Sequence, residues 1–176
     1  MQTTQCYIAR DGNTLMLHRV KKKSDLNHDK WIGIGGKFEH GESPEECMLR
    51  EVREETGLTL TKWAYRGIVT FVQGGYCEYM HLFTATAFEG TLSECDEGTL
   101  EWVPTAELTR LPMWEGDALF LCLLAQDRPF FSLKLVYEGE RLARAMQMCI
   151  RDSTNRAAER SSSTKVETPR IFSAPS

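Results

Sequence analysis

The sequence predicts an α/β domain with strands before, between and after two helices. Three observations lead to this expectation: segments with the alternating apolar pattern of strands, one helix with well-defined ends, and a length of 176 residues, which suits a single domain with a sizeable core. Apolar residues make up 41% of the chain and charged residues 26%, which is ordinary for a soluble globular protein.

The first expected element is a hairpin. Residues 3–9 and 14–18 have strand character, and the turn sequence DGN lies between them. A polar loop follows at residues 21–30. The next stretch, WIGIGGK at residues 31–37, contains a glycine pair that lets the backbone approach another group closely.

A helix is predicted over residues 43–56. Ser43 is a good N-cap, Pro44 suits the first helical position, and Glu46 completes a capping box. Gly57 is a suitable helix end.

The second half predicts more strands and one more helix. Strands are expected at residues 67–72, 79–88, 100–103 and 131–137. A helix is expected at residues 115–125, with an apolar stripe through Leu119, Cys122 and Leu123.

The predicted domain covers residues 1–142, and residues 143–176 are expected to form a disordered tail because residues 153–176 lack a periodic apolar face. The string QMCIRDS at residues 147–153 resembles the translation of a transposon-end sequencing adapter. We hypothesise that the chain from about residue 147 is an assembly artefact, the alternative being a natural basic tail. An uninterrupted genomic reading frame across codon 147 would exclude the artefact.

Charge and hydropathy argue against several classes of protein. The net charge is −4 without a basic stripe, so no nucleic-acid polymer is expected as a partner. No apolar run approaches the roughly 18 residues of a membrane helix, and the first ten residues lack a signal-peptide layout, which makes the cytoplasm the expected location. The six scattered cysteines are expected to be buried apolar residues without disulfides.

Three glutamates share one face of the first predicted helix. Glu51, Glu54 and Glu55 stand at i, i+3 and i+4, where like charges repel unless a cation neutralises them. Carboxylate oxygens suit a hard cation, and Mg²⁺ binds one or two carboxylates together with substrate phosphates. Gly36 could add a backbone oxygen, and Arg50 could orient a carboxylate. A solvated acidic helix face is the alternative.

The pattern G-x₅-E-x₇-R-E-V-x-E-E-x-G-L, from Gly36 to Leu58, matches the signature of the Nudix family at every specified position. Its fixed Gly, Glu and Arg positions coincide by chance about 10⁻⁹ of the time per start. The resemblance implies a Nudix fold, an α/β/α sandwich around a mixed β-sheet whose loop–helix–loop holds divalent metal. It also implies hydrolysis of a nucleoside diphosphate linked to another group.

The resemblance assigns roles to individual residues. Glu51, Glu54 and Glu55 are implied ligands of Mg²⁺ or Mn²⁺, and Gly36 belongs to the same site. Glu97 is the candidate for a fourth carboxylate, because it lies five residues before a tryptophan as in MutT-like members; an exposed loop acid is the alternative. Glu51 is favoured as the general base, with Glu97 as the alternative.

Resemblance outside the signature covers roughly residues 3–140 and is closest to MutT-like oxidised-purine nucleoside triphosphatases, including the human-type enzyme. The segment WIGIGGK, the pair E…W around residues 97–102 and the segment MWEGD carry it. It implies that Trp114 stacks on a base, a contact worth about 1–3 kcal/mol, and that Asp117 hydrogen-bonds a purine edge. A core tryptophan is the alternative for Trp114.

Two positions depart from the human-type pattern. Ile32 stands where that enzyme has Asn, and Gly116 precedes Asp117 where it has two adjacent acids. The expected reaction is hydrolysis of 8-oxo-dGTP to 8-oxo-dGMP and pyrophosphate. Arg19 and Lys37 are expected phosphate contacts, although either could be a surface cation.

Other functions remain as alternatives. A Nudix hydrolase could act on ADP-ribose, a dinucleotide polyphosphate or a plain dNTP. A non-catalytic nucleotide-binding regulator would carry a broken signature, for example Gln at position 54 or 55, and an isoprenoid diphosphate isomerase would need a cysteine motif that this chain lacks. A free nucleotide is the expected partner of a monomer or homodimer.

Overall fold

The computed structural model describes residues 1–21 and 26–149, which form one mixed sheet with helices on both faces. The strands follow the order β3-β2-β1-β5-β4-β7-β8, and β6 also pairs with β2. Their bounds are β1 Gln2–Arg10, β2 Asn13–His18, β3 Trp31–Ile32, β4 Thr59–Gln73, β5 Tyr76–Glu89, β6 Thr99–Pro104, β7 Phe131–Glu138 and β8 Arg141–Cys149. Strand β1 is parallel to β5 and β4 is parallel to β7, whereas the other paired strands are antiparallel.

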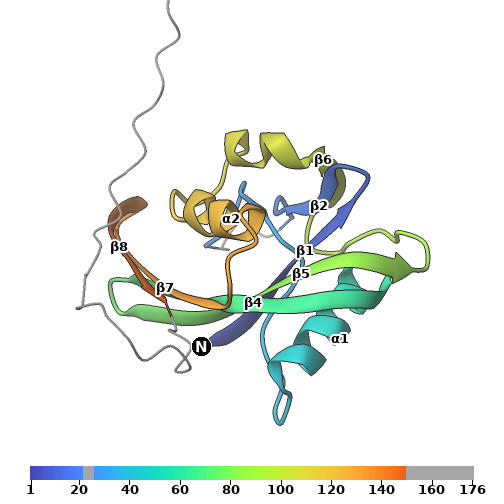
Figure 1. Cartoon of the computed structure of the whole chain (residues 1–176), viewed down its shortest axis with the longest axis horizontal. Coiled ribbons are helices and arrows are strands. Elements are labelled where there is room, and N and C mark those ends of the chain that lie inside the picture. The colour runs from blue at the N-terminus through green and yellow to red at the C-terminus, as the bar shows by residue number, and fades with distance from the viewer. Residues whose placement is uncertain (22–25, 150–176) are drawn as a thin grey trace, which may run out of the picture.

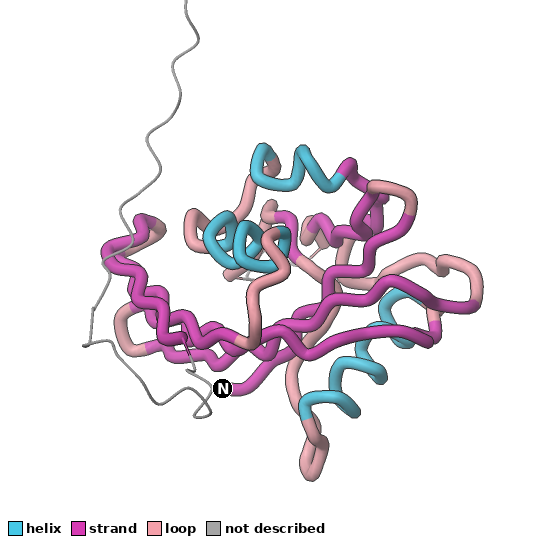
Figure 2. Tube along the Cα trace, in the orientation of Figure 1, coloured by secondary structure: helices cyan, strands magenta, loops and turns pink. Residues whose placement is uncertain are grey.

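The two faces of the sheet carry separate apolar cores. Helix α1 (Pro44–Thr56) covers one face, and α2 (Asp117–Ala125) with the 3₁₀ helix η1 (Thr105–Arg110) covers the other (Figure 1). Side chains alternate along β1, so Ile8 packs in the core that contains Met48 of α1, and Tyr7 in the core that contains Phe120 of α2. The strands form the middle layer in Figure 2. The predicted α/β/α sandwich around a mixed sheet is confirmed.

Helix α1 begins and ends where the sequence predicts. The Ser43 hydroxyl accepts a hydrogen bond from the Glu46 backbone N–H at 3.2 Å, and the Glu46 carboxylate accepts one from the Ser43 N–H at 2.8 Å. Gly57 ends the helix with φ 73°, a conformation that favours glycine. These caps set the ends of α1, and the buried side chains of Met48 and Val52 determine which of its faces meets the sheet.

The predicted apolar stripe of the second helix is wrong at one of its three positions: Leu119 and Leu123 pack against the core, as predicted, and Cys122 does not. Helix α2 begins at Asp117 and buries Asp117, Phe120 and Leu121, whereas Cys122 is exposed. Most residues of the segment DALFLCLLA are apolar, so periodicity alone does not single out the buried face. The expectation that every cysteine is buried is wrong at Cys122, which is exposed, and at Cys77, which is only partly buried.

The end of the predicted domain needs a correction. Strand β8 continues through Cys149 and pairs antiparallel with β7, with Leu133 opposite Gln147, so an ordered element extends beyond residue 142. An edge strand needs a partner on one side only, and the Arg- and Ala-rich sequence of β8 gave little strand signal. The remaining expected tail, residues 150–176, and residues 22–25 of the polar loop lie outside the described residues.

Other differences concern element lengths. Strand β4 starts at Thr59 and is longer than the strand that the sequence predicts at residues 67–72. Its early part is mostly exposed and contains register shifts. Such a partly exposed, irregular stretch lacks a clear period of two. None of the helices in the described part of the chain is long and apolar enough to cross a membrane.

Candidate active site

The glycine segment is held directly against β1. The Gly36 carbonyl accepts a hydrogen bond from the Thr4 N–H at 2.8 Å, and Ile34 exchanges backbone hydrogen bonds with Cys6 at 2.7 and 2.9 Å. A Cβ on Gly35 would lie 2.3 Å from the Thr4 carbonyl oxygen, and one on Gly36 would lie 2.5 Å from the Glu51 carboxyl carbon. Glycines are therefore required here, because Gly35 lies against the backbone of β1 and Gly36 lies against the Glu51 carboxylate of α1.

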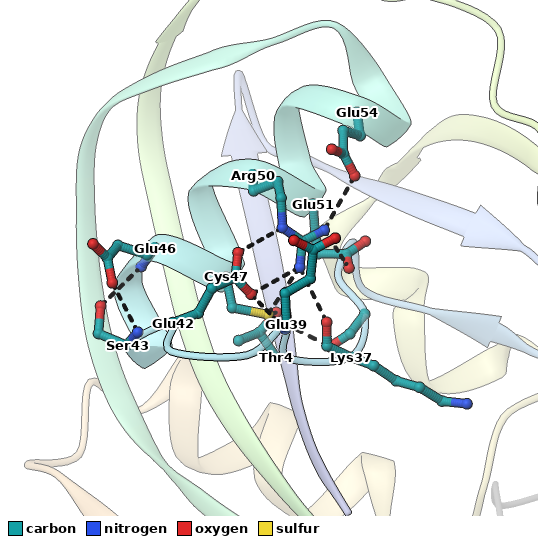
Figure 3. A network of polar contacts seen from close by, with 11 residues as sticks. Thr4, Lys37, Glu39, Glu42, Ser43, Glu46, Cys47, Arg50, Glu51 and Glu54 are labelled. Atoms are coloured by element: carbon teal, nitrogen blue, oxygen red, sulfur yellow. Dashed lines mark hydrogen bonds and ion pairs between the residues drawn. The ribbon is translucent and has the colours of Figure 1, made fainter.

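Arg50 joins three glutamates through its guanidinium group (Figure 3). Its Nε and one terminal nitrogen hold both Glu42 oxygens at 2.6 and 2.9 Å. The other terminal nitrogen donates to Glu51 at 2.8 Å and Glu54 at 3.1 Å. A further bond of 3.1 Å reaches the Lys37 carbonyl. This planar fork links the glycine loop to the acidic face of α1.

These contacts act on the Glu42 and Arg50 charges. The two bonds from Arg50, aided by the Glu39 backbone N–H, lower the pKa of Glu42 to about 2. The same pairing raises the pKa of Arg50 further above its usual value. Both groups are therefore charged across the neutral range.

Two other glutamates of α1 lie deeper. Glu55 is 7% exposed and accepts a hydrogen bond from the Gly35 N–H at 3.1 Å. Burial raises the pKa of Glu55 to about 8, opposed by the Gly35 bond and reinforced by the charges of Glu97 and Glu51. Burial also raises the pKa of Glu51, opposed by Arg50. A cation at this point would stabilise both carboxylates in their charged forms.

Pairing of β2 with β6 brings Glu97 close to the glutamates of α1. His18 lies opposite Thr99, so Arg19 and Glu97, which follow and precede these strands, meet. One terminal nitrogen of Arg19 donates to Glu97 at 2.5 Å. Glu97 is thus a charged neighbour of the α1 carboxylates.

A cavity of about 640 Å³ opens beside these groups. Among the predicted site residues, its walls include Arg19, Ile32, Gly36, Lys37, Glu51 and Glu97. Arg50, Glu54 and Glu55 do not line it, but Arg50 donates hydrogen bonds to Glu51 of the wall and to Glu54, and Glu55 accepts one from the Gly35 N–H of the wall. The structure therefore gathers the predicted acidic and basic residues around one opening.

A smaller cavity of about 40 Å³ shares several walls with the larger one and is lined by Ile32, Trp114 and Asp117. Trp114 is only 5% exposed, packs edge-on against Phe71, and donates from its indole N–H to Asn27 at 2.8 Å. The Lys30 ammonium lies 4.6 Å from the centre of its ring. Trp114 is consequently a core residue that also borders the cavity.

Asp117 is buried beside that tryptophan. It is 6% exposed, and burial raises its pKa from 3.8 to about 8, with opposing contributions from the Trp114 backbone and Lys30. At neutral pH most of this carboxyl group is protonated and can donate a hydrogen bond.

The raised pKa of Asp117 predicts a pH-dependent stability. Between pH 3.8 and about 8 the folded protein retains a proton that the unfolded chain releases, so the free energy of unfolding falls as pH rises through this window. Asp117→Asn cannot ionise, and we expect its melting temperature relative to the unchanged protein to rise by several degrees between pH 5 and pH 8. Thermal melts at both pH values, with the exposed Asp96→Asn as control, measure this. An equal difference at both pH values would contradict a buried protonated Asp117.

Several cavity residues were missed by sequence reasoning: Thr3, Gln5, Asn27, Tyr76, Glu78 and Met80. They come from β1, the polar loop and β5, which are far apart in the sequence. The one available signal was a glutamine within the otherwise strand-like segment at residues 3–9. Only the parallel pairing of β1 with β5 places Thr3 opposite Met80.

The carboxylates match the chemistry of a divalent metal. No three acidic, histidine or cysteine side chains within residues 1–21 and 26–149 converge closely enough to coordinate an ion as they stand. Glu51 and Glu54 instead share Arg50, and Glu55 bonds Gly35. The donor set is nevertheless all oxygen, and burial together with like charges makes a cation favourable there.

Comparison with known proteins identifies the family. A family model described as the NUDIX domain matches residues 2–124. The chain belongs to the Nudix family. Nudix hydrolases act on phosphoric anhydride bonds of small nucleotide substrates and use divalent metal ions, so this chain is a hydrolase of that class.

Individual relatives differ in what their names state. The oxidized purine nucleoside triphosphate hydrolase of Danio rerio is 35% identical over 111 residues, which is 62% of this chain and 71% of that protein. The CTP pyrophosphohydrolase of Escherichia coli (strain K12) is 27% identical over 117 residues, 66% of this chain and 85% of that protein. The crystal structure of the MutT protein from Bacillus halodurans superposes with a TM-score of 0.74 at 27% identity, covering 83% of this chain and 96% of that one. The Nudix fold is thus shown, whereas the names of these relatives state different nucleotide bases in the substrate.

Proposed function

We propose that this Nudix hydrolase converts an oxidised purine nucleoside triphosphate, such as 8-oxo-dGTP, to the nucleoside monophosphate and pyrophosphate with Mg²⁺. The single observation behind this proposal is the shared boundary of the two cavities. The larger cavity is lined by Glu51, Glu97 and Gly36, and the smaller one by Trp114 and Asp117. A nucleotide could therefore place its phosphates and its base at the two ends of one opening.

On the phosphate side, we assign Glu51, Glu54, Glu55 and Glu97, with the Gly36 carbonyl, to hold Mg²⁺ or Mn²⁺. A bound ion would lower the pKa of water and neutralise phosphate charge. Arg50 orients Glu51 and Glu54 through the bonds described above.

Protein side chains would then act on the reacting atoms. Water adds to phosphorus, the α–β anhydride bond breaks, and the water proton passes to a carboxylate. Glu51 and Glu97 both line the cavity, and we favour Glu51 as the base with Glu97 as the alternative. Arg19 and Lys37 line the same cavity and would bind phosphate oxygens.

On the base side, Asp117 supports a purine with a carbonyl at its edge. Its neutral carboxyl group can donate to such an oxygen. Ile32 borders both cavities and supplies an apolar wall. A base could contact the edge of Trp114 where the indole borders the smaller cavity, and stacking on its face would require Lys30 to move. Such a reaction would remove oxidised nucleotides from the pool of DNA precursors.

Product analysis tests the reaction. With Mg²⁺ and 8-oxo-dGTP, we expect equal amounts of 8-oxo-dGMP and pyrophosphate, and no turnover in excess EDTA. Release of 8-oxo-dGDP and inorganic phosphate would contradict cleavage at the α–β bond.

Similarity to a CTP pyrophosphohydrolase favours a second candidate, hydrolysis of a cytidine triphosphate by the same residues. It predicts faster turnover of CTP than of 8-oxo-dGTP under identical conditions.

A further inference from the structure

Gln5 is a buried polar residue beside the cavities. It lies in the middle of β1 and is 5% exposed, and its side chain lines both the larger and the smaller cavity. The strand directs alternate residues to opposite faces. Thr4 contacts Cys47 of α1 and Cys6 packs in the α1 core, whereas Gln5 faces the cavities.

The carboxamide oxygen of Gln5 is buried without a hydrogen-bond partner among the residues that the structure describes. Such a group is unusual, because most buried polar atoms are paired and an unpaired one is destabilising. An apolar residue in the same place would avoid this cost. The position is therefore better explained by a partner that arrives with a ligand than by a role in folding alone.

The contacts of the Gln5 side chain leave its amide oxygen free to turn toward a hydrogen-bond donor on a ligand. Gly33 lies against its side chain, since a Cβ there would come within 2.9 Å of the Gln5 Cγ atom. This contact holds the aliphatic part of the side chain, whereas the terminal amide torsion is soft and can turn the oxygen toward the opening.

A second acceptor stands on the neighbouring parallel strand. The Glu78 carboxylate lines both cavities and is held by the Thr3 hydroxyl at 2.5 Å and the Tyr76 hydroxyl at 2.7 Å. A carboxylate has capacity for about four hydrogen bonds, so it can accept more from a ligand. The Gln5 oxygen and the Glu78 carboxylate are two acceptors on this wall, which suits a base edge that carries N–H donors.

We propose that Gln5 is a specificity-determining residue, whose side-chain oxygen accepts a hydrogen bond from an N–H group on the edge of the bound base. The proposal rests on the proposed nucleotide hydrolysis and narrows it to a substrate class. Bases with edge donors, such as guanine with its N1–H and 2-amino group, are favoured over purines that lack them. A site that hydrogen-bonds a substrate group rejects an analogue without that group far more strongly than an apolar pocket does.

The test compares two bases of similar shape. Guanine has edge N–H donors, and unsubstituted purine has none. We expect the ratio of kcat/KM for dGTP to that for purine deoxyriboside triphosphate to fall at least tenfold in Gln5→Met, which keeps an unbranched side chain of similar length without an acceptor. The ratio should fall because kcat/KM for dGTP decreases, and kcat/KM for the purine nucleotide should change much less. Equal loss for both nucleotides, or no loss, would overturn the role of Gln5.

Two variants control for indirect effects. Gln5→Glu keeps an acceptor and removes the amide donor, so the ratio should stay within about threefold of that of the unchanged enzyme even if both rates fall. A ratio that collapses in this variant would instead indicate that the amide N–H is the reading group and would overturn the proposal. Cys6→Ala changes the opposite face of the same strand and should leave the ratio unchanged.

A binding measurement separates this role from the identity of the true substrate. Calorimetric titration with dGMP and with purine deoxyriboside monophosphate should show the same tenfold change in the affinity ratio on Gln5→Met. If 8-oxo-dGTP is not preferred over dGTP but this ratio changes, the oxidised-purine assignment fails and the role of Gln5 stands. If 8-oxo-dGTP is preferred and the ratio does not change, only the role of Gln5 fails.

Discussion

Glu54→Gln is expected to lower kcat more than about a hundredfold while leaving the fold intact, because the variant loses a proposed ligand of the catalytic metal. The structural cost should be small. The Glu54 side chain is 61% exposed, and its contact with Arg50 is an i,i+4 pair at 3.1 Å, a type of pair worth about 0.3–0.5 kcal/mol. A large loss of turnover with an almost unchanged melting temperature therefore distinguishes a metal ligand from a solvated helix acid.

Glu45→Gln provides the matched control, since it removes the same charge from the first turn of the same helix. We expect it to retain nearly full activity. When the residual activity of Glu54→Gln is measured against Mg²⁺ concentration, half-maximal activity should require more Mg²⁺ than in the unchanged enzyme. Activity within a few-fold of the unchanged enzyme would defeat the assignment of Glu54 to the metal site.

Arg50→Lys should reduce both stability and turnover although it keeps the charge. Lysine cannot hold both oxygens of Glu42 and also reach Glu51 and Glu54 in the fixed planar geometry of the guanidinium group. We expect kcat/KM to fall at least about tenfold, since groups that orient metal ligands typically contribute 10–100-fold. The melting temperature at pH 7 should fall by several degrees.

The pH dependence of that stability loss identifies its source. The pKa of Glu42 is lowered to about 2 by Arg50, so this pairing stabilises the fold above the ordinary pKa of 4.5 and is lost as pH falls from 4.5 toward 2. The difference in melting temperature between Arg50→Lys and the unchanged protein should therefore shrink in this window. A difference that stays constant down to pH 2 would show that Arg50 acts on stability through packing instead.

Local signals in the sequence account for the part of the site that could be predicted. The capping box, the terminal glycine and the glutamate spacing are contained within a few residues, so Glu51, Glu54 and Glu55 could be placed on one helix face. The structure adds that Arg50 draws two of them together and that Glu55 turns toward Gly35.

The features that the sequence did not predict depend on contacts between distant segments of the chain. Gln5 and Glu78 line the same cavity because β1 and β5 pair in parallel. No local sequence pattern encodes the register of that pairing. The buried face of α2 could not be chosen because apolar residues occur all around it, so Phe120 was missed. Strand β8 was missed because its pairing with β7 compensates for a weak strand sequence.

The most direct test of the proposed function is a comparison of kcat/KM with Mg²⁺ for 8-oxo-dGTP, 2-oxo-dATP, dGTP, CTP, ADP-ribose and a dinucleotide polyphosphate. The account predicts a preference of at least tenfold for an oxidised purine triphosphate, which corresponds to about 1.4 kcal/mol in the transition state. Equal or faster turnover of CTP, dGTP or another member of the panel would leave the Nudix hydrolase in place and contradict the oxidised-purine assignment.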